Sequence, residues 1–209
     1  SSSGPVSFVK GFDTWAGITK SAGKTRRAAK MVILNVDHPD IEDFIKSKVT
    51  VEKMARDLIK MGWPADYNSE TYSFLPYQNA NHSVRVTDDF MRAVEQDKNF
   101  DLINFKKIKV KELSAKNLFR TIAEAAHLCA DPGIQFDTTI NSWHTSPNSG
   151  RINAANPCSE YMFVDDSACN LASHNLVKYY KDREFNIEAF VKATEITITA
   201  MEIAVAISS

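Results

Sequence analysis

The sequence predicts an α/β fold in which most strands pair in parallel. Short apolar runs typical of buried strands, such as residues 31–36, alternate along the chain with longer stretches in which apolar residues recur every three or four positions. Strands that alternate with helices favour parallel pairing joined by right-handed crossovers. The chain has 209 residues, of which 44% are hydrophobic, and this is enough for one sizeable core.

The first helix is predicted to begin at Pro5, because proline suits a first helical position and an apolar stripe follows it. The helix is expected to end near Gly23. A basic turn at residues 24–27 then leads into the strand at residues 31–36. Such a turn either lies in solvent or uses its cations, beside a glycine, to bind phosphate. The apolar stripe comprises Val6, Val9, Phe12, Trp15 and Ile18.

Two helices are predicted between residues 37 and 61. Asp37 is a candidate N-cap for the first helix, which has an apolar face. The second is expected at residues 51–61, where the following Gly-Trp-Pro sequence ends it. The apolar face of the first helix comprises Ile41, Phe44 and Ile45.

A strand region is predicted at residues 73–86. Its second half, residues 79–86, alternates polar with small or apolar residues, which is the period of a strand with one face toward a polar cavity. The same pattern is typical of an ordinary exposed strand. The side chains that would line such a cavity are Gln78, Asn79, Asn81 and His82.

Two capped helices are predicted next, with a hairpin arm between them. Thr87 caps the first, and Ser114 caps the second, in which Cys129 lies on the packed face as an inert thiol. Between them, residues 106–111 alternate lysine with aliphatic residues, which predicts a hairpin arm with a solvated face. A short strand, a helical turn and a polar loop follow, up to residue 150.

The C-terminal part is predicted to form one helix that begins at Asn186. Charged residues interrupt its wide apolar stripe, so we expect a buried helix rather than a membrane span. The chain starts without methionine and ends at Ser209 within a helical pattern. We therefore expect residues 1–209 to be an internal fragment, one partial domain cut at both ends.

The composition excludes several classes of partner. The net charge of -1 gives no electrostatic attraction for nucleic acid or for an anionic membrane surface. The three cysteines show no C-x-x-C spacing, and no signal-peptide pattern is present. These features favour a reducing, cytoplasmic compartment and argue against a disulfide scaffold.

The residues that suggest chemistry are Asn156, Cys158 and Glu160, at alternate positions of the sequence Asn-Pro-Cys-Ser-Glu. If this segment is extended, their side chains leave the same side of the backbone and face one substrate. A thiol can give up and take back a hydrogen atom, a carboxylate can accept a hydroxyl proton, and an amide can hold neighbouring hydroxyls. The set suits radical chemistry on a polyol. The alternative is a buried structural cysteine beside a surface glutamate.

Residues 146–161 and 169–173 closely resemble the finger loop of ribonucleotide reductases. The proline before Cys158 and the Ser-Glu-Tyr sequence after it are similar to the adenosylcobalamin-dependent class of that family. Further matches are Ser-Gly-Pro-Val-Ser-Phe at residues 3–8, Lys-Thr-Arg-Arg-Ala-Ala from residue 24 and Val-Asp-His-Pro-Asp-Ile from residue 36. The resemblance therefore covers nearly the whole chain.

The resemblance implies a role for each residue of the cysteine segment. Cys158 would become the thiyl radical that takes the ribose 3′ hydrogen, and Glu160 would accept the 3′-hydroxyl proton. Asn156 would hydrogen-bond the ribose hydroxyls, and the whole segment, with Pro157 and Ser159, would contact substrate.

The resemblance also implies a reducing dithiol. Cys169 would be one half of it, and would end each turnover in a disulfide. The other half is expected upstream of residues 3–5, because Cys129 stands in a helical context that does not match it.

The resemblance further implies the fold, cofactor and partners. The fold would be part of a ten-stranded α/β barrel with the cysteine loop threaded through its centre. The cofactor would be adenosylcobalamin, the substrate a ribonucleoside di- or triphosphate, and the reductant of the thioredoxin type. Residues 23–27 (Gly23, Lys24, Thr25, Arg26 and Arg27) would form the specificity loop that responds to a deoxynucleotide or ATP effector. A homodimer is possible.

Three rival functions are weighed against this reading. A cysteine hydrolase would use Cys158 as nucleophile and His144 or His174 as base. This function leaves Asn156, Glu160 and Cys169 without roles. A structural zinc site built from Cys158, Cys169, His144 and His174 lacks the short ligand spacing usual for zinc. The third alternative is a fragment that keeps the motifs without activity.

Overall fold

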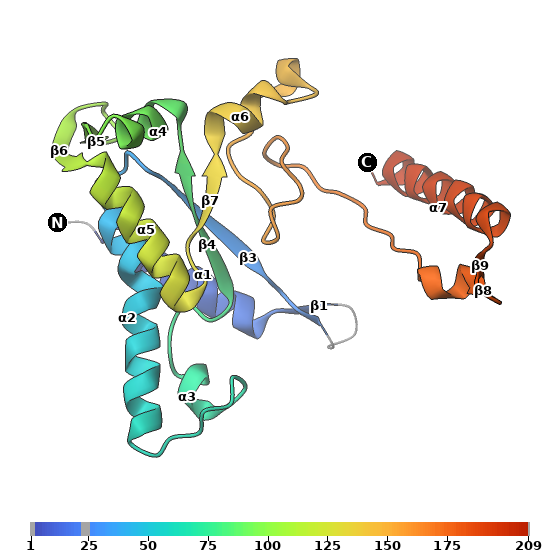
Figure 1. Ribbon diagram of the computed structural model, residues 1–209, viewed down its shortest axis with the longest axis horizontal. Helices are drawn as coiled ribbons and strands as arrows, with labels where there is room; N and C mark the ends of the chain where they lie inside the picture. The colour runs from blue at the N-terminus through green and yellow to red at the C-terminus, as the bar shows by residue number, and fades with distance from the viewer. Residues whose placement is uncertain (1–2, 22–25, 209) are drawn as a thin grey trace. The chain divides into compact units, whose positions relative to one another are not determined.

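The structure, a computed structural model, describes residues 3–21 and 26–208 and has the α/β fold that the sequence predicts (Figure 1). The chain forms two compact units, Ser1–Asp165 and Asp166–Ser209. The first unit contains a parallel sheet and its helices, and the second contains the C-terminal helix.

A three-stranded parallel sheet is the centre of the first unit. Its strands are β3 (Lys30–Asn35), β4 (Ala80–Val86) and β7 (Gly133–Phe136), with β4 in the middle. The register places Arg85 of β4 opposite Asn35 on one side and Gln135 on the other. This pairing confirms the predicted parallel sheet. The described strands form sheets of two or three, and none of these closes into a barrel.

Helix α1 (Pro5–Ile18) begins where the sequence predicts but ends before the expected Gly23. Its Asp13 is only 3% exposed and accepts hydrogen bonds from the backbone N–H groups of Gln78, Asn79 and Ala80, at 3.2, 2.7 and 2.8 Å. The helix thus fixes the start of β4. After α1, the short strands β1 (Lys20–Ser21) and β2 (Arg26–Arg27) pair in antiparallel fashion.

Helix α2 (Ile41–Lys60) is one continuous helix, so the prediction of two helices is wrong here. Asp40, rather than Asp37, occupies its N-cap position. Its end agrees with the prediction: Gly62 has a φ of +97°, and the N–H groups of Gly62 and Trp63 donate to carbonyls of the last turn, at 3.0 and 3.2 Å. The strand expected from residue 73 begins only at Ala80, and α3 (Glu70–Ser73) precedes it.

The middle of the chain confirms most of the predicted elements. Thr87 caps α4 (Asp88–Glu95) by accepting from the N–H of Phe90 at 3.3 Å, and Ser114 caps α5 (Ala115–Cys129) in the same way. β5 (Asn99–Ile103) and β6 (Lys109–Ser114) form the expected antiparallel hairpin. Cys129 is partly buried, and this burial raises the pKa of its thiol, as expected for a packed, unreactive cysteine.

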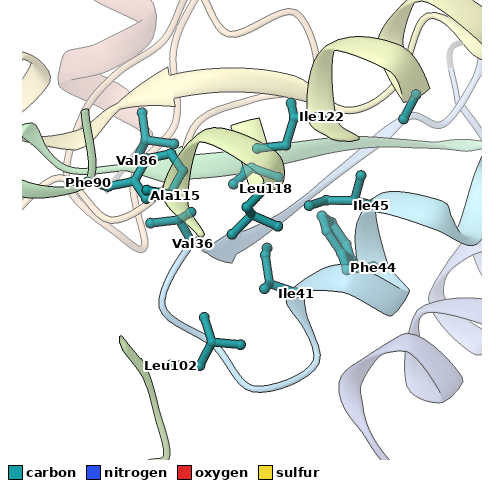
Figure 2. Close-up of a cluster of buried hydrophobic side chains, with 12 residues drawn as sticks. Val36, Ile41, Phe44, Ile45, Val86, Phe90, Leu102, Ala115, Leu118 and Ile122 are labelled. Carbon is teal, nitrogen blue, oxygen red and sulfur yellow. The ribbon is translucent and has the colours of Figure 1, made fainter. Parts of the chain in front are cut away.

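The hydrophobic core lies between the sheet and the helices α2 and α5, which contact each other (Figure 2). Side chains alternate along β4, so Val84 and Val86 face this core, whereas Asn81, Ser83 and Arg85 lie on the opposite face. The two faces of β4 therefore serve different purposes. The buried core residues are Val36, Ile41, Phe44, Ile45, Val84, Val86, Phe90, Leu102, Ala115, Leu118, Ile122 and Ala125.

The second unit consists of a 3-10 turn (Leu176–Tyr179), the strands β8 (Tyr180–Lys181) and β9 (Glu184–Phe185), and α7 (Ile187–Ile207). Asn186 caps α7, as predicted. No described residue of α7 is buried, so the prediction of a buried helix is wrong. The apolar stripe gave the period of the helix correctly but did not determine what covers it. Among the described residues, no helix is long and apolar enough to cross a membrane.

His82 is the polar side chain on the core side of β4. Its ring stacks on Phe44 with centroids 4.8 Å apart and meets the Tyr77 ring edge-on at 5.4 Å. Its Nε2 atom is buried and has no hydrogen-bond partner among the described residues. Burial, together with the nearby Lys48 charge, lowers the pKa of His82 from 6.5 to about 3.

This burial predicts a pH-dependent loss of stability. In the folded state His82 stays neutral down to about pH 3, whereas in the unfolded state it binds a proton below about pH 6.5. Its contribution to the free energy of unfolding is therefore complete above pH 6.5 and falls as the pH is lowered toward 3, by at most about 1.4 kcal/mol per pH unit. Urea denaturation across this range should show a flatter pH dependence for His82→Gln than for wild type.

The matched control is His127→Gln, since His127 lies exposed on α5. This variant should keep the wild-type pH dependence. Identical slopes for His82→Gln and wild type would contradict the burial of an uncharged imidazole.

Candidate active site

The loop that carries Cys158 is attached to the sheet by a buried arginine. The side chain of Arg85 is 2% exposed, and its Nε donates to Asp137 Oδ1 at 2.6 Å. Its Nη1 donates to Gln135 Oε1 at 3.0 Å, and its Nη2 donates to the backbone carbonyl of Ile152 at 2.6 Å. One guanidinium therefore joins β4, β7, the start of α6 (Asp137–Ser142) and the cysteine loop.

The start of the loop has a second attachment, through α6. Asn141 Nδ2 donates to the carbonyl of Ile152 at 3.1 Å, and the N–H of Ile152 donates to Asn141 Oδ1 at 3.0 Å. Asp137 also forms an ion pair with Arg151. The side chain of Ile152 is buried. Both backbone groups of Ile152 are therefore held by side chains.

The tip of the loop is attached on both sides of Cys158. Asn81 Nδ2, from β4, donates to the backbone carbonyl of Pro157 at 2.8 Å. Gln135 Nε2, from β7, donates to Ser159 Oγ at 3.3 Å. The sheet thus contacts the residue before the cysteine and the residue after it.

Residues 156–159 form a tight turn rather than the extended segment considered from the sequence. The N–H of Ser159 donates to the carbonyl of Asn156 at 2.9 Å, and Pro157 takes the second position of the turn, which suits its fixed φ. Ser159 has a φ of +63°. The side chain of Asn156 accepts from the N–H of Tyr161 at 2.9 Å. Because the segment turns, strand alternation cannot align the three side chains, and that reasoning was wrong.

The turn presents its thiol to solvent. Cys158 is a free, exposed cysteine, so the alternative of a buried structural cysteine is excluded. Glu160 is also exposed, and Asn156 is partly buried. The turn therefore carries an accessible thiol with a carboxylate two residues after it.

Cys169 belongs to the second unit, where it is also free and exposed. The next residue, Asn170, donates from Nδ2 to the carbonyl of Met201 in α7 at 3.2 Å. Residues 170–172 are irregular and line a groove of about 450 Å³ against α7. The helix thus holds the chain directly after Cys169.

The residues proposed from the sequence for the specificity loop and for a polar cavity lie in several different places. Gly23, Lys24 and Thr25 lie outside the described residues, and Arg26 and Arg27 form β2. Of the expected cavity-lining side chains, Gln78 and Asn81 border a cavity of about 300 Å³ beside Tyr67, Tyr72 and Tyr77. Gln78 and Asn79 border a neighbouring cavity of about 380 Å³. His82 is instead buried against the core, as described above.

The contacts of His144 do not support its role as the base of a cysteine hydrolase. Both ring nitrogens of His144 contact backbone: Nδ1 accepts from the N–H of Ser146 at 3.3 Å, and Nε2 lies 3.1 Å from the carbonyl of Gly150. This histidine is therefore occupied and is not free to act as a base for Cys158. His174 lies in the second unit and contacts the Tyr179 hydroxyl. Within residues 3–21 and 26–208, no group of three or more acidic, histidine or cysteine side chains is placed to hold a metal ion.

Sequence reasoning missed the residues that hold the loop, namely Arg85, Gln135, Asp137 and Asn141. A signal was present for three of them. Arg85 stands between two valines in a buried strand, and a buried arginine requires partners. Asp137 and Asn141 are four residues apart, so they share one face of a helix. Their common target, Ile152, could not be read from the sequence.

Comparison with known proteins identifies the family. The family model described as "Ribonucleotide reductase, barrel domain" matches residues 1–209. The chain belongs to the ribonucleotide reductase family. It is 56% identical over 209 residues to the vitamin B12-dependent ribonucleotide reductase of Streptomyces avermitilis, with 97% of this chain and 22% of that protein covered.

Other members of the ribonucleotide reductase family are similar over a comparable range. The vitamin B12-dependent ribonucleotide reductase of Rhodopirellula baltica is 51% identical, covering 97% of this chain and 20% of that protein. The vitamin B12-dependent ribonucleoside-diphosphate reductase of Mycobacterium tuberculosis is 40% identical, covering 86% and 22%. The chain therefore spans about a fifth of the length of these relatives.

The buried arginine predicts a large effect of its removal. Arg85→Met keeps an unbranched side chain but removes the guanidinium. The Asp137 carboxylate then keeps only the exposed Arg151 as its ion-pair partner, and the Ile152 carbonyl loses one of its donors. We expect the free energy of unfolding to fall by about 3–5 kcal/mol in chemical denaturation.

Arg92→Met is the matched control, because Arg92 pairs with Asp88 and Asp89 on the exposed surface of α4. Its effect should be far smaller. Equal losses in the two variants would contradict the role assigned to Arg85.

Proposed function

We propose that the whole protein to which this chain belongs reduces ribonucleotides to 2′-deoxyribonucleotides, with Cys158 as the residue that attacks the sugar. The observation that carries this proposal is the accessible Cys158 thiol on a turn held by the sheet, between Asn156 and Glu160, in a chain matched throughout by the barrel-domain model. In this proposal the described strands are part of a ten-stranded barrel that the rest of the protein completes.

The proposed chemistry begins at Cys158. In its thiyl form, the sulfur takes the hydrogen atom from C3′ of the ribose, and Glu160 accepts the proton of the 3′-hydroxyl. A thiol proton from the reducing dithiol is transferred to the 2′-hydroxyl, which leaves as water. After reduction of the sugar, Cys158 returns the hydrogen atom to C3′, and Glu160 returns its proton. Asn156 hydrogen-bonds the ribose hydroxyls and orients the sugar.

The proposed cofactor is adenosylcobalamin, because the relatives are named as vitamin B12-dependent. When bound, it supplies the carbon-centred radical that removes the hydrogen atom of a thiol. The residue present here that fits this partner is Cys158, since its sulfur is reduced, free and exposed. The bound substrate and the rest of the whole protein must then exclude water from the reactive sulfur.

Two electrons are needed for each deoxyribonucleotide formed. We propose that Cys169 and a second cysteine, upstream in the whole protein, supply them as a dithiol and become a disulfide. A thioredoxin-type reductant would then restore the dithiol by thiol–disulfide exchange. The balance is one ribonucleotide and one dithiol giving one deoxyribonucleotide, one disulfide and water.

Substrate and effector complete the proposal. The substrate is a ribonucleoside di- or triphosphate. Residues 23–27 respond to a deoxynucleotide or ATP effector, in a protein that can form a homodimer. The activity belongs to the whole protein, and the 209-residue chain alone is expected to show no turnover.

Replacing the radical-bearing sulfur tests the proposed function. Cys158→Ala in the whole protein should abolish deoxyribonucleotide formation while leaving nucleotide binding unchanged, because only the reacting atom is removed. Product chromatography and equilibrium binding measure the two effects. Cys129→Ala is the control and should keep activity, since Cys129 is a packed thiol. Deoxyribonucleotide formation by Cys158→Ala would refute the proposal.

Cys169 is tested separately by the number of turnovers. Cys169→Ser should allow the sugar radical to form but should prevent repeated reduction, because the disulfide cannot form. Under multiple-turnover conditions with a dithiol reductant, product should stay at or below about one equivalent per active site. Normal steady-state turnover by this variant would remove Cys169 from the mechanism.

A further inference from the structure

Two side chains of the sheet contact the Cys158 turn from different strands. Asn81 reaches the carbonyl of Pro157 at 2.8 Å, and Gln135 reaches the hydroxyl of Ser159 at 3.3 Å. We propose that Asn81 and Gln135 are positioning residues that orient the Cys158 thiol for its reaction. The inference rests on the proposed function of Cys158 and extends it to residues that do not touch the reacting atoms.

The strand register explains why these two side chains are in reach. Asn81 and Arg85 are four residues apart on β4 and share one face, and Gln135 of β7 lies beside Arg85. Four residues of strand span about 13 Å. The loop is bound at Ile152 by Arg85 and at Pro157 by Asn81, so it crosses the sheet face between these contacts.

The two contacts fix the backbone on either side of the cysteine. The Pro157 carbonyl belongs to the peptide unit that precedes the Cα atom of Cys158, so the hydrogen bond from Asn81 fixes the plane of that unit. The Ser159 hydroxyl is attached to the residue that follows. With both neighbours held, the direction of the Cα–Cβ bond of Cys158 is fixed, and with it the region that the sulfur can reach.

The contact from Gln135 also holds a strained residue. Ser159 has a φ of +63°, a left-handed conformation that costs a residue with a side chain about 1–2 kcal/mol. The hydrogen bonds of Ser159 to Gln135 and to the carbonyl of Asn156 offset this cost. Without Gln135, the turn is expected to open more often.

Loss of either contact to the turn should affect the reaction step rather than substrate binding. A misdirected thiol does not weaken the binding of a substrate, but it reduces the fraction of bound substrate that reacts. A loss of either contact should therefore lower kcat and leave KM nearly unchanged. Replacing a residue that contributed only to overall stability would lower the melting temperature, but it would not lower kcat selectively while leaving KM unchanged.

The first test uses Asn81→Asp, which keeps the size of the side chain but replaces the donor NH₂ group with an acceptor oxygen facing the Pro157 carbonyl. In the whole protein we expect kcat to fall roughly tenfold or more, with KM within about twofold. The matched control is Asn117→Asp on α5, which should match wild type. Asn81→Ala is the second variant, used if the new charge prevents folding.

A second readout does not depend on activity. The N–H groups of Ser159 and Tyr161 are both hydrogen-bonded within the turn. Hydrogen–deuterium exchange of the peptide that contains them, measured by mass spectrometry, should be faster in Asn81→Asp and Gln135→Ala than in wild type. Exchange in α5 should stay unchanged in Asn81→Asp.

A double-mutant cycle isolates the contact between Gln135 and Ser159, because Gln135 also accepts from Arg85. Gln135→Ala and Ser159→Ala should each lower kcat, and the double variant should lose less than the product of the two losses. Ser159→Gly removes the strain together with the hydroxyl, so it should keep more activity than Ser159→Ala.

The outcomes separate the two proposals. If wild type makes no deoxyribonucleotide, the proposed function fails whatever the exchange data show. If wild type is active but Asn81→Asp, or Asn81→Ala in its place, keeps both kcat and the exchange rate of the turn, the positioning role of Asn81 is refuted. Strictly multiplicative losses in the cycle would refute the contact between Gln135 and Ser159.

Discussion

The buried guanidinium of Arg85 is the interaction on which the site depends. A charge that is 2% exposed must be paired, and Arg85 forms an ion pair with Asp137 and donates to Gln135 and the carbonyl of Ile152. A buried ion pair of this kind contributes little net stability compared with apolar side chains, because desolvation offsets the attraction. The ion pair instead selects one conformation of the loop, because the buried charge is paired only when the loop lies in this position.

The two faces of β4 have different roles, so a small sheet can contribute both to the hydrophobic core and to the candidate active site. On one face Val84 and Val86 pack with α2 and α5, and on the other Asn81 and Arg85 bind the cysteine loop. Because a strand alternates its side chains, each face can be specialised without disturbing the other. The stability of the apolar layer thus supports a polar layer whose groups hold the Cys158 turn.

Local features of the fold could be predicted from the sequence, but contacts between distant residues could not. The caps at Thr87 and Ser114 depend on side chains within a few residues, and both predictions are confirmed. The turn at residues 156–159 was missed because its left-handed serine and its bonds to the sheet depend on residues far away in the chain. The burial of α7 was also predicted wrongly, because a periodic apolar stripe identifies a helix but not the element that packs against it.

The cysteine loop, bound to the sheet by Arg85 at Ile152, is proposed to deliver the Cys158 sulfur to a ribose. The most direct measurement is a crystal structure of the whole protein with a ribonucleotide bound. The account predicts the sulfur within about 3.5 Å of the 3′ carbon of the sugar, with the bond from Arg85 to Ile152 intact. A sugar bound away from Cys158, or a loop released from Arg85 in the substrate complex, would contradict it.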